Sequence, residues 1–248
     1  MKVIYILWLR QLKRYYRSKA RMIGALGQPL LFLVALGFGF GPIYQKAGGG
    51  NYIQFLTPGI IAMSILFIAT FSGIEVIWDR EFGFLKETLV APVSRFKIMI
   101  GRTIGGATVS VLQGIIVLLI STLFGFRPIS IYLLFVSLIF MILIATLFTA
   151  VGTAIACLLT DMHAFQLIIN FFIMPLFFLS GALFPLQGLP TAFTFIARIN
   201  PLAYGVDGLR ATLANSAQFG IFTDIIILSG ITFIFLAIGS YLFSKMQV

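Results

Sequence analysis

Charged residues are scarce in this 248-residue chain, at 10% of the sequence against about 25% in an ordinary soluble domain. Acidic residues are scarcer still, with 7 Asp and Glu against 17 Lys and Arg. The single cysteine excludes an intrachain disulfide, and the single histidine, His163, has no further ligands for a metal site and no nucleophile to activate. The Gly-x-x-x-x-Gly-Lys-Ser/Thr pattern that cradles ATP phosphates is absent. These absences predict a chain that is not an enzyme and binds no cofactor or metal.

What the chain has instead is six long apolar stretches without a charge, within a composition that is 60% hydrophobic. A membrane-spanning helix needs about 20 apolar residues, and helices pair their own backbone groups inside hydrocarbon. The sequence therefore predicts an all-α polytopic membrane protein, a single transmembrane domain over residues 1–248. The expected spans cover about 22–41, 55–77, 103–125, 131–157, 164–183 and 224–244.

The basic residues lie mostly on one side of these spans. They crowd the segment before the first span and the loop between the second and third, whereas the other side carries only Lys46, Arg127, Arg198 and Arg210. The positive-inside rule then places both termini in the cytoplasm. Because no soluble basic domain exists to present the net charge of +10, anionic lipid headgroups are the expected partners and nucleic acid is not.

Residues 1–21 predict a basic amphipathic helix in the plane of the membrane. At 100° per residue the arginines fall on one face and apolar or aromatic side chains on the opposite face. The arginines are Arg10, Arg14, Arg17 and Arg21, and the opposite face holds Ile4, Tyr5, Trp8, Leu12, Tyr15 and Tyr16. The pattern fits an anchor that sets topology, and it also fits a helix that docks on a partner.

The cytoplasmic loop 78–100 interleaves apolar side chains with charges of both signs. With Glu75, it gathers four of the seven acidic residues. Anionic lipid headgroups repel acidic side chains. A short amphipathic helix that docks on another protein is therefore favoured over one that lies on the headgroups. Pro92 ends this helix.

The segment after the fifth expected span is apolar but interrupted by proline. Pro185 and Pro190 break it where it should reach the outer face, and Phe193 would otherwise face water. This pattern predicts short re-entrant helices over 184–200, with Asn200 and Tyr204 fixing the turn back to the surface. Asp207 and Arg210 stand at helical i, i+3 spacing and are expected to pair.

A few polar and small residues inside the spans have two open interpretations. Gln113, Gln166 and Asn170 either line a transport path or form hydrogen bonds between helices. Small residues that allow close helix contact are Gly101 with Gly105 and Ala150 with Ala154. Asp161 and His163 are expected to cap the fifth span. No acidic residue is expected in mid-membrane to relay a proton.

The order of these features resembles the type-2 ABC exporter permeases, the family of daunorubicin-resistance, nodulation-factor and polysaccharide export permeases. The resemblance rests on the basic amphipathic helix, the loop from Asp79-Arg80-Glu81 through Pro92-Val93-Ser94 to Gly101-Arg102, and the block Asn200-Pro201-Leu202-Ala203-Tyr204 with Asp207 and Arg210. It implies that Phe84 to Ala91 is a coupling helix inserted into a separate cytoplasmic ATPase subunit, which binds the ATP and Mg. It also implies that Phe184 to Arg198 forms an external gate.

The site residues that follow fall into two groups. The coupling residues are Asp79, Arg80, Glu81, Phe84, Leu85, Glu87, Leu89 and Pro92. The gate residues are Phe184, Pro185, Pro190, Asn200, Pro201, Tyr204, Asp207 and Arg210.

The function expected from this resemblance is export of a hydrophobic, drug-like small molecule or a lipid-linked compound out of the cytoplasm. The permease would sit in a prokaryotic cytoplasmic membrane as a homodimer or beside a paralogous permease. The alternatives are export of a lipid-linked polysaccharide by the same machinery and a stand-alone carrier driven by an ion gradient.

Overall fold

A computed structural model describes residues 2–83, 94–188 and 190–246, and every regular element in those ranges is a helix. This confirms the all-α prediction. The elements are α1 (Lys2–Arg17), α2 (Lys19–Lys46), α3 (Tyr52–Phe71), α4 (Ile74–Glu81), α6 (Arg95–Leu123), α7 (Ile131–Leu158), α8 (Met162–Ile168), the π-helical η1 (Ile169–Ile173), α9 (Met174–Phe178), α10 (Thr191–Ile199), α11 (Pro201–Ala214) and α12 (Ile221–Lys245).

Among the described residues, five helical stretches are long and apolar enough to cross a bilayer: α2, α3 with α4, α6, α7 and α12. The chain is therefore a multi-pass membrane protein. Several helices extend beyond their uncharged runs. The third, for example, was expected at 103–125 but begins at Arg95, because charged residues continue the same helix outside the apolar stretch.

The fifth expected span, 164–183, is shorter and less regular than predicted. Its helical part is Met162–Phe178, made of α8, η1 and α9 with 7, 5 and 5 residues. At 1.5 Å per residue it measures about 25 Å, less than a hydrocarbon core of about 30 Å. Pro175 accounts for the π-helical turn, because its ring lacks an N–H and would clash with the carbonyl group four residues earlier.

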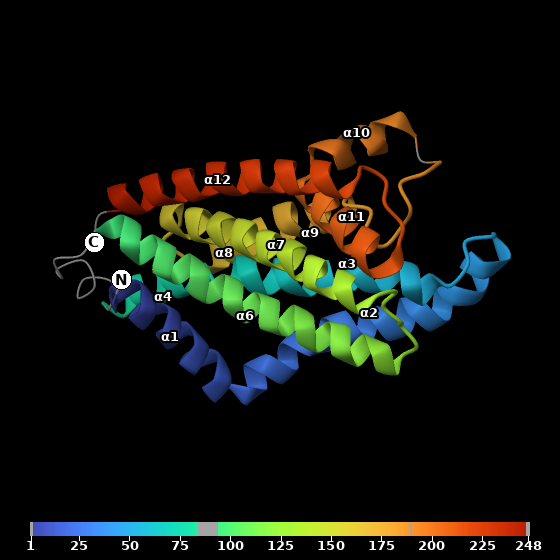
Figure 1. Cartoon of the computed structure of the whole chain (residues 1–248). Helices are drawn as coiled ribbons and strands as arrows, with labels where there is room; N and C mark the ends of the chain where they lie inside the picture. Colours follow the sequence, from blue (N-terminus) through green and yellow to red (C-terminus); the bar gives the residue numbers. More distant parts are fainter. Residues whose placement is uncertain (1, 84–93, 189, 247–248) are drawn as a thin grey trace.

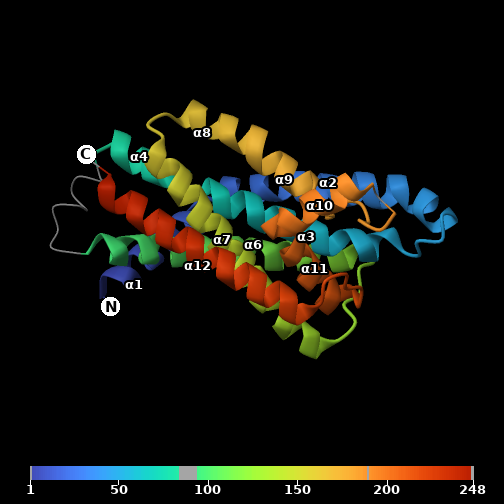
Figure 2. The same cartoon turned by 90° about the horizontal axis from the view of Figure 1, so that it is seen from above.

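The helices form an elongated bundle whose chain ends lie together. The beginning of α1 and the end of α12 lie at one end, next to α4, whereas α10 and the connection between α2 and α3 lie at the other (Figure 1). The view from above places α7 between α8 and α12 (Figure 2). In the most apolar part of α3 with α4, 72% of the residues are buried, whereas only 17% are buried in the corresponding parts of α2 and α12. α3 is thus the central helix, and α2 and α12 present apolar surface outward.

Glycines allow the central helices to touch through their backbones. A Cβ atom on Gly73, at the α3–α4 junction, would overlap the carbonyl group of Gly152 in α7, and one on Gly152 would overlap that of Thr70. The expected contact at Ala150 and Ala154 is also present, with Gly239 of α12 as the partner. Close approach at α7 therefore joins α3, α4 and α12.

Replacing Gly152 by Ala should destabilise the protein, since the new methyl group has backbone rather than a flexible side chain in its way. Overpacking of this kind costs about 1–3 kcal/mol. The matched control is Gly230→Ala in α12, where a Cβ meets nothing within 4 Å and alanine favours the helix. Thermal unfolding midpoints of the purified variants in detergent should fall for Gly152→Ala only. Equal midpoints for the two variants would contradict the backbone contact.

Candidate functional site

The helix α4 leads toward the expected coupling segment, and its carboxylates are held by arginines. Asp79 is buried, with 5% of its surface exposed. One of its carboxylate oxygens accepts a hydrogen bond from Arg10 of α1 at 2.9 Å, and the other accepts one from Arg102 of α6. A buried carboxylate is tolerated when it is paired in this way. Asp79 therefore ties α4 to α1 and α6.

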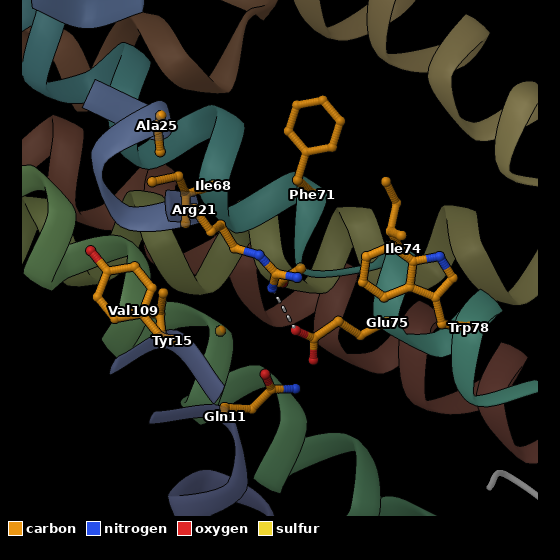
Figure 3. Close-up of a pocket in the computed structure, with 13 residues that line it drawn as sticks. Gln11, Tyr15, Arg21, Ala25, Ile68, Phe71, Ile74, Glu75, Trp78 and Val109 are labelled. Atoms are coloured by element: carbon orange, nitrogen blue, oxygen red, sulfur yellow. Dashed lines mark ion pairs between the residues drawn. The ribbon is translucent and has the colours of Figure 1, made fainter. Parts of the chain in front are cut away.

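Glu75 lies one turn earlier on the same face of α4 and has looser partners. Its carboxylate oxygens lie 3.6 Å from Arg14 of α1 and 3.5 Å from Arg21 of α2. Both guanidinium groups also lie over the Trp78 ring, 5.2 Å and 5.7 Å from its centroid, within cation–π range. Figure 3 shows Arg21 directed at Glu75, with Trp78 beside them.

The opposite face of α4 reaches the ends of α7 and α12. Arg80 donates to the carbonyl oxygens of Leu159 at 2.9 Å and Cys157 at 3.4 Å, which are free at the end of α7, and it also contacts Met246. Glu81 is exposed. The other expected coupling residues, Phe84, Leu85, Glu87, Leu89 and Pro92, lie outside the described residues.

α1 packs against α6 of the bundle. Its backbone and side chains cross α6 at Gly101 and Gly105, where an added Cβ would crowd Leu7 and Gln11. The predicted apolar face is divided: Tyr15 is buried, whereas Tyr16 remains 79% exposed. The arginine face is directed at α4, so charges interpreted from sequence as lipid contacts also serve internal pairing.

At the opposite end of the bundle, Asn200 fixes the start of α11. Its side-chain oxygen accepts from the N–H of Leu202 at 3.0 Å, and its amide donates to the carbonyl of Leu176 at 2.6 Å. The Tyr204 hydroxyl donates to the carbonyl of Arg198, also at 2.6 Å. Pro201 occupies the first turn of α11, where its missing N–H costs nothing. Asn200 and Tyr204 therefore hold the turn between α10 and α11.

The predicted ion pair between Asp207 and Arg210 is wrong. Arg210 donates to the carbonyl oxygen of Gly181 at 3.0 Å and lies 3.9 Å from the centroid of the Phe55 ring. Asp207 accepts instead from the backbone N–H groups of Gln218 and Phe219, each at 2.8 Å. Helical spacing allows the pair, but each side chain is turned to backbone groups that have no other partner among the described residues.

The segment 184–200 begins as irregular chain and then forms α10. Phe184 is 49% exposed, Pro185 lies in a connection without regular structure, and Pro190 immediately precedes α10. The next helix, α11, is the buried one, since every residue from Leu202 to Leu213 is buried among α3, α7 and α12. The most protected helix of this region thus begins after the predicted gate segment.

The three candidate path residues are not brought together. Gln113 is fully buried, accepts from the hydroxyl of Tyr15 and donates to the carbonyl of Met22 at 3.4 Å, so it joins α6 to α1 and α2. Gln166 and Asn170 are exposed on α8 and η1 and bond to each other at 3.2 Å. Only the latter two are free to face a path.

The turn between α7 and α8 has the capping role that the sequence predicts. The Asp161 carboxylate accepts from the backbone N–H groups of His163 at 3.1 Å and Ala164 at 3.0 Å. These hydrogen bonds lower the pKa of Asp161. Among the residues that the structure describes, no group of three potential metal ligands occurs, and His163 belongs to this cap.

A family model described as ABC-2 type transporter matches residues 2–214. The chain belongs to the ABC-2 type transporter family. The match covers α1, the α4 region and α11, which are the three parts that carry the resemblance in the sequence.

Relatives of this ABC-2 chain are similar over most of its length. A putative transport permease ycf38 of Cyanophora paradoxa is 31% identical over 221 residues, which are 86% of this chain and 75% of that protein. Nodulation protein J of Rhizobium leguminosarum bv. viciae is 30% identical over 214 residues, covering 83% and 82%. Nodulation protein J of Rhizobium meliloti (strain 1021) is 29% identical over 220 residues, covering 84% and 82%.

One buried acidic residue of the ABC-2 chain is not evident from the sequence pattern. Asp224 stands at the start of a long apolar run, where it looks like a boundary. Its surface is 0% exposed, its carboxyl group faces that of Asp207, and neither oxygen meets a donor group among the described residues. The one feature of the sequence that points to this burial is the position of Asp224 in the first turn of a spanning helix.

Asparagine substitutions should separate the two acids. Asp207→Asn would place an NH₂ group against the N–H groups of Gln218 and Phe219 and should destabilise the ABC-2 chain by about 1–3 kcal/mol. Asp224→Asn should leave the free energy of unfolding unchanged or raise it. The new amide can donate to Asp207, and the substitution removes repulsion between two buried carboxyl groups. Thermal unfolding in detergent measures both. A larger loss for Asp224→Asn than for Asp207→Asn would refute this assignment.

Proposed function

We propose that this chain is the membrane permease of an ATP-binding-cassette exporter that moves a hydrophobic small molecule or a lipid-linked compound out of the cytoplasm. A separate ATPase subunit, which binds ATP and Mg, supplies the energy. Membership of the ABC-2 family and the missing phosphate-binding pattern support the assignment of transport and ATP hydrolysis to separate subunits. The similarity to nodulation protein J and to a transport permease supports the export role.

The observation that carries this proposal is the attachment of α4. Its residues contact α1 and α6 through Asp79, α1 and α2 through Glu75, and the end of α7 through Arg80. A force applied by an ATPase to the segment after α4 would therefore reach several membrane helices at once. The segment 84–91 is the proposed coupling helix, and Asp79 and Arg80 transmit its movement without touching the ATPase.

The proposed orientation places both termini in a prokaryotic cytoplasm. The beginning of α1, α4 and the end of α12 lie at one end of the bundle, where the basic residues are concentrated (Figure 1). The positive-inside rule favours the cytoplasmic side for this end. In this orientation α8, η1 and α9 form a sixth, short crossing, and α10 and α11 lie on the outer side.

A homodimer, or a dimer with a paralogous permease, would cover the exposed polar face of α8 and η1. Gln166 and Asn170 have only each other as described partners, and exposed amides are costly in lipid. Phe171 on the same segment is 80% exposed. A second copy, with the transport path between the two, would place these amides in protein or water.

The alternative cargo is a lipid-linked polysaccharide carried by the same machinery. The other alternative is a stand-alone carrier driven by an ion gradient, which needs acids along the path. Asp207 and Asp224 form a buried acidic pair, but they lie at the end opposite Glu75 and Asp79. The acidic residues that the structure describes lie on α4, before α8, on α11 and in the first turn of α12, and the long helices α6 and α7 contain none, so these helices offer no acid for a proton relay.

Coupling is tested by substitutions in the proposed docking helix. Leu89→Asp and Glu87→Arg should each weaken association with the ATPase, since a misplaced charge in such an interface costs about 2–5 kcal/mol. Lys245→Glu, an exposed charge reversal at the same end of the bundle, is the control. Co-purification of the ATPase and export from cells should fall together in the two loop variants. Wild-type association and export in both would refute the docking proposal.

The outer gate is tested by its prolines. Pro185→Ala and Pro190→Ala would loosen the irregular chain before α10 and should reduce export, while ATPase association stays normal. Pro128→Ala, in the connection between α6 and α7, is the control at the same end. Export and co-purification are measured on the same membranes. Normal export by both variants would remove the segment 184–190 from the gate.

A further inference from the structure

Two open features flank Trp78 at the end of the bundle that carries the chain termini. One is a cavity of about 460 Å³ between α1, α2, α6 and the α3–α4 junction. The other is a wider groove of about 820 Å³ along α1 and α4. Trp78 lines both, and Arg14 of the groove reaches Glu75 of the cavity. The two features are therefore neighbours with different chemistry.

The cavity is mostly apolar. Its wall is formed by Ala25, Ile68, Phe71, Ile74 and Val109, and the ion pair of Arg21 with Glu75 stands at one side (Figure 3). Small residues of α2 keep it open, since a Cβ atom on Gly24 would meet nothing within 4 Å. Its volume falls in the range of about 300–1,000 Å³ that is usual for ligand pockets. It suits a hydrocarbon chain.

The groove is basic. It is lined by Arg10, Lys13, Arg14 and Arg17, and Asp79 is the one acidic residue among its described lining. Asp79 is already occupied by Arg10 and Arg102. Lys13 and Arg17 stand four residues apart on one helix face, where like charges repel, and neither forms an ion pair with a described residue. An anion between them would relieve that repulsion.

The arginines near Trp78 also have N–H groups that are not engaged in close hydrogen bonds with described residues. Arg14 and Arg21 lie 3.6 Å and 3.5 Å from Glu75, longer than the 2.7–2.9 Å of a close charge-assisted hydrogen bond. The contact of Arg10 with Asp79, at 2.9 Å, is the tighter kind. Arg14 can therefore turn part of its guanidinium group to an anion in the groove, while Glu75 keeps Arg21.

We propose that the groove and the cavity form one site for an anionic amphiphile with a phosphate headgroup. The phosphate binds Lys13, Arg17 and Arg14, and the hydrocarbon chain enters the cavity beside Trp78. A zwitterionic headgroup fits poorly, because the groove offers its cationic part no free carboxylate among the described residues. The site lies within one copy of the chain and does not depend on the exposed face of α8.

The same chemistry could come from a bilayer phospholipid or from a phosphorylated lipid cargo. In the first case the site is a structural lipid site that holds α1 and α2 in place. In the second it also serves the proposed export, as a point of entry for the cargo. Binding is measured without an ATPase or transport, so a failure of the export proposal would leave the result on this site unchanged.

Trp78 is itself the reporter. The chain has two tryptophans, so a Trp8→Phe background leaves Trp78 as the sole emitter. The full chain is placed in nanodiscs containing phosphatidylcholine and increasing fractions of brominated-chain phosphatidylglycerol, whose bromine atoms quench tryptophan on contact. Brominated-chain phosphatidylcholine is the parallel series. Half-maximal quenching is expected at a roughly tenfold lower fraction of the anionic lipid.

Matched variants locate the two parts of the amphiphile. The double variant Lys13→Gln/Arg17→Gln should remove the preference for the anionic lipid, whereas Lys19→Gln, a basic residue outside the groove, should keep it. Gly24→Leu should fill the cavity and reduce quenching by both lipids. Gly27→Leu on the same helix is the control, because its Cβ is equally free but does not line the cavity.

Competition then distinguishes the sources. Unlabelled polyprenyl phosphate that restores Trp78 emission at lower fractions than unlabelled phosphatidylglycerol assigns the site to a lipid cargo, with the polyprenyl alcohol as control. Equal or weaker competition assigns it to the bilayer phospholipid. Equal quenching by anionic and zwitterionic lipids in the parent, or unchanged quenching in Gly24→Leu, would overturn the site.

Discussion

The packing of this protein depends on two carboxylates of α4 that arginines neutralise from three other helices. Glu75 and Asp79 are buried at the end of the bundle where the chain begins and ends. Each would be costly there without its partners, and removal of one partner leaves a charge uncompensated. The charges therefore fix the position of α4 relative to α1, α2 and α6. α4 precedes the proposed docking segment. The arginine contacts that neutralise its buried carboxylates therefore also determine which helices an ATPase could move through α4.

The opposite end is held by backbone groups in place of ion pairs. Arg210 satisfies a carbonyl of the irregular chain after α9, Asp207 satisfies two N–H groups before α12, and Asn200 closes the turn into α11. Buried backbone outside regular helices needs such partners, since an unpaired buried N–H or carbonyl group is costly. The buried polar side chains around α11 are thus explained by the unpaired backbone around them. The α11 end is held by directional hydrogen bonds. The α4 end is held by ion pairs, whose attraction changes little when the helices move slightly relative to one another.

The sequence predicts the helices better than the contacts between them. Uncharged length alone locates α7 almost to the residue, because the bilayer forces each apolar run to satisfy its own backbone. It does not reveal the π-helical turn before Pro175 or the burial of Asp224, which depend on neighbours distant in the chain. Asp207 and Arg210 show why spacing misleads: i, i+3 geometry permits a pair, but tertiary partners were available to each. The docking residues from Phe84 to Pro92 fall outside the described part of the chain.

α1 shows how one amphipathic helix can serve several purposes at once. Its glycine-facing side is packed on α6, its Arg10 and Arg14 neutralise α4, and its Lys13 and Arg17 remain directed at the groove. The break at Ser18 then turns the chain into α2 and leaves the cavity between them. A bound amphiphile would fill that cavity and neutralise the remaining cations. It would stabilise the same α1–α4 arrangement on which the proposed coupling depends, and Arg14, which lines the groove and faces Glu75, would take part in both.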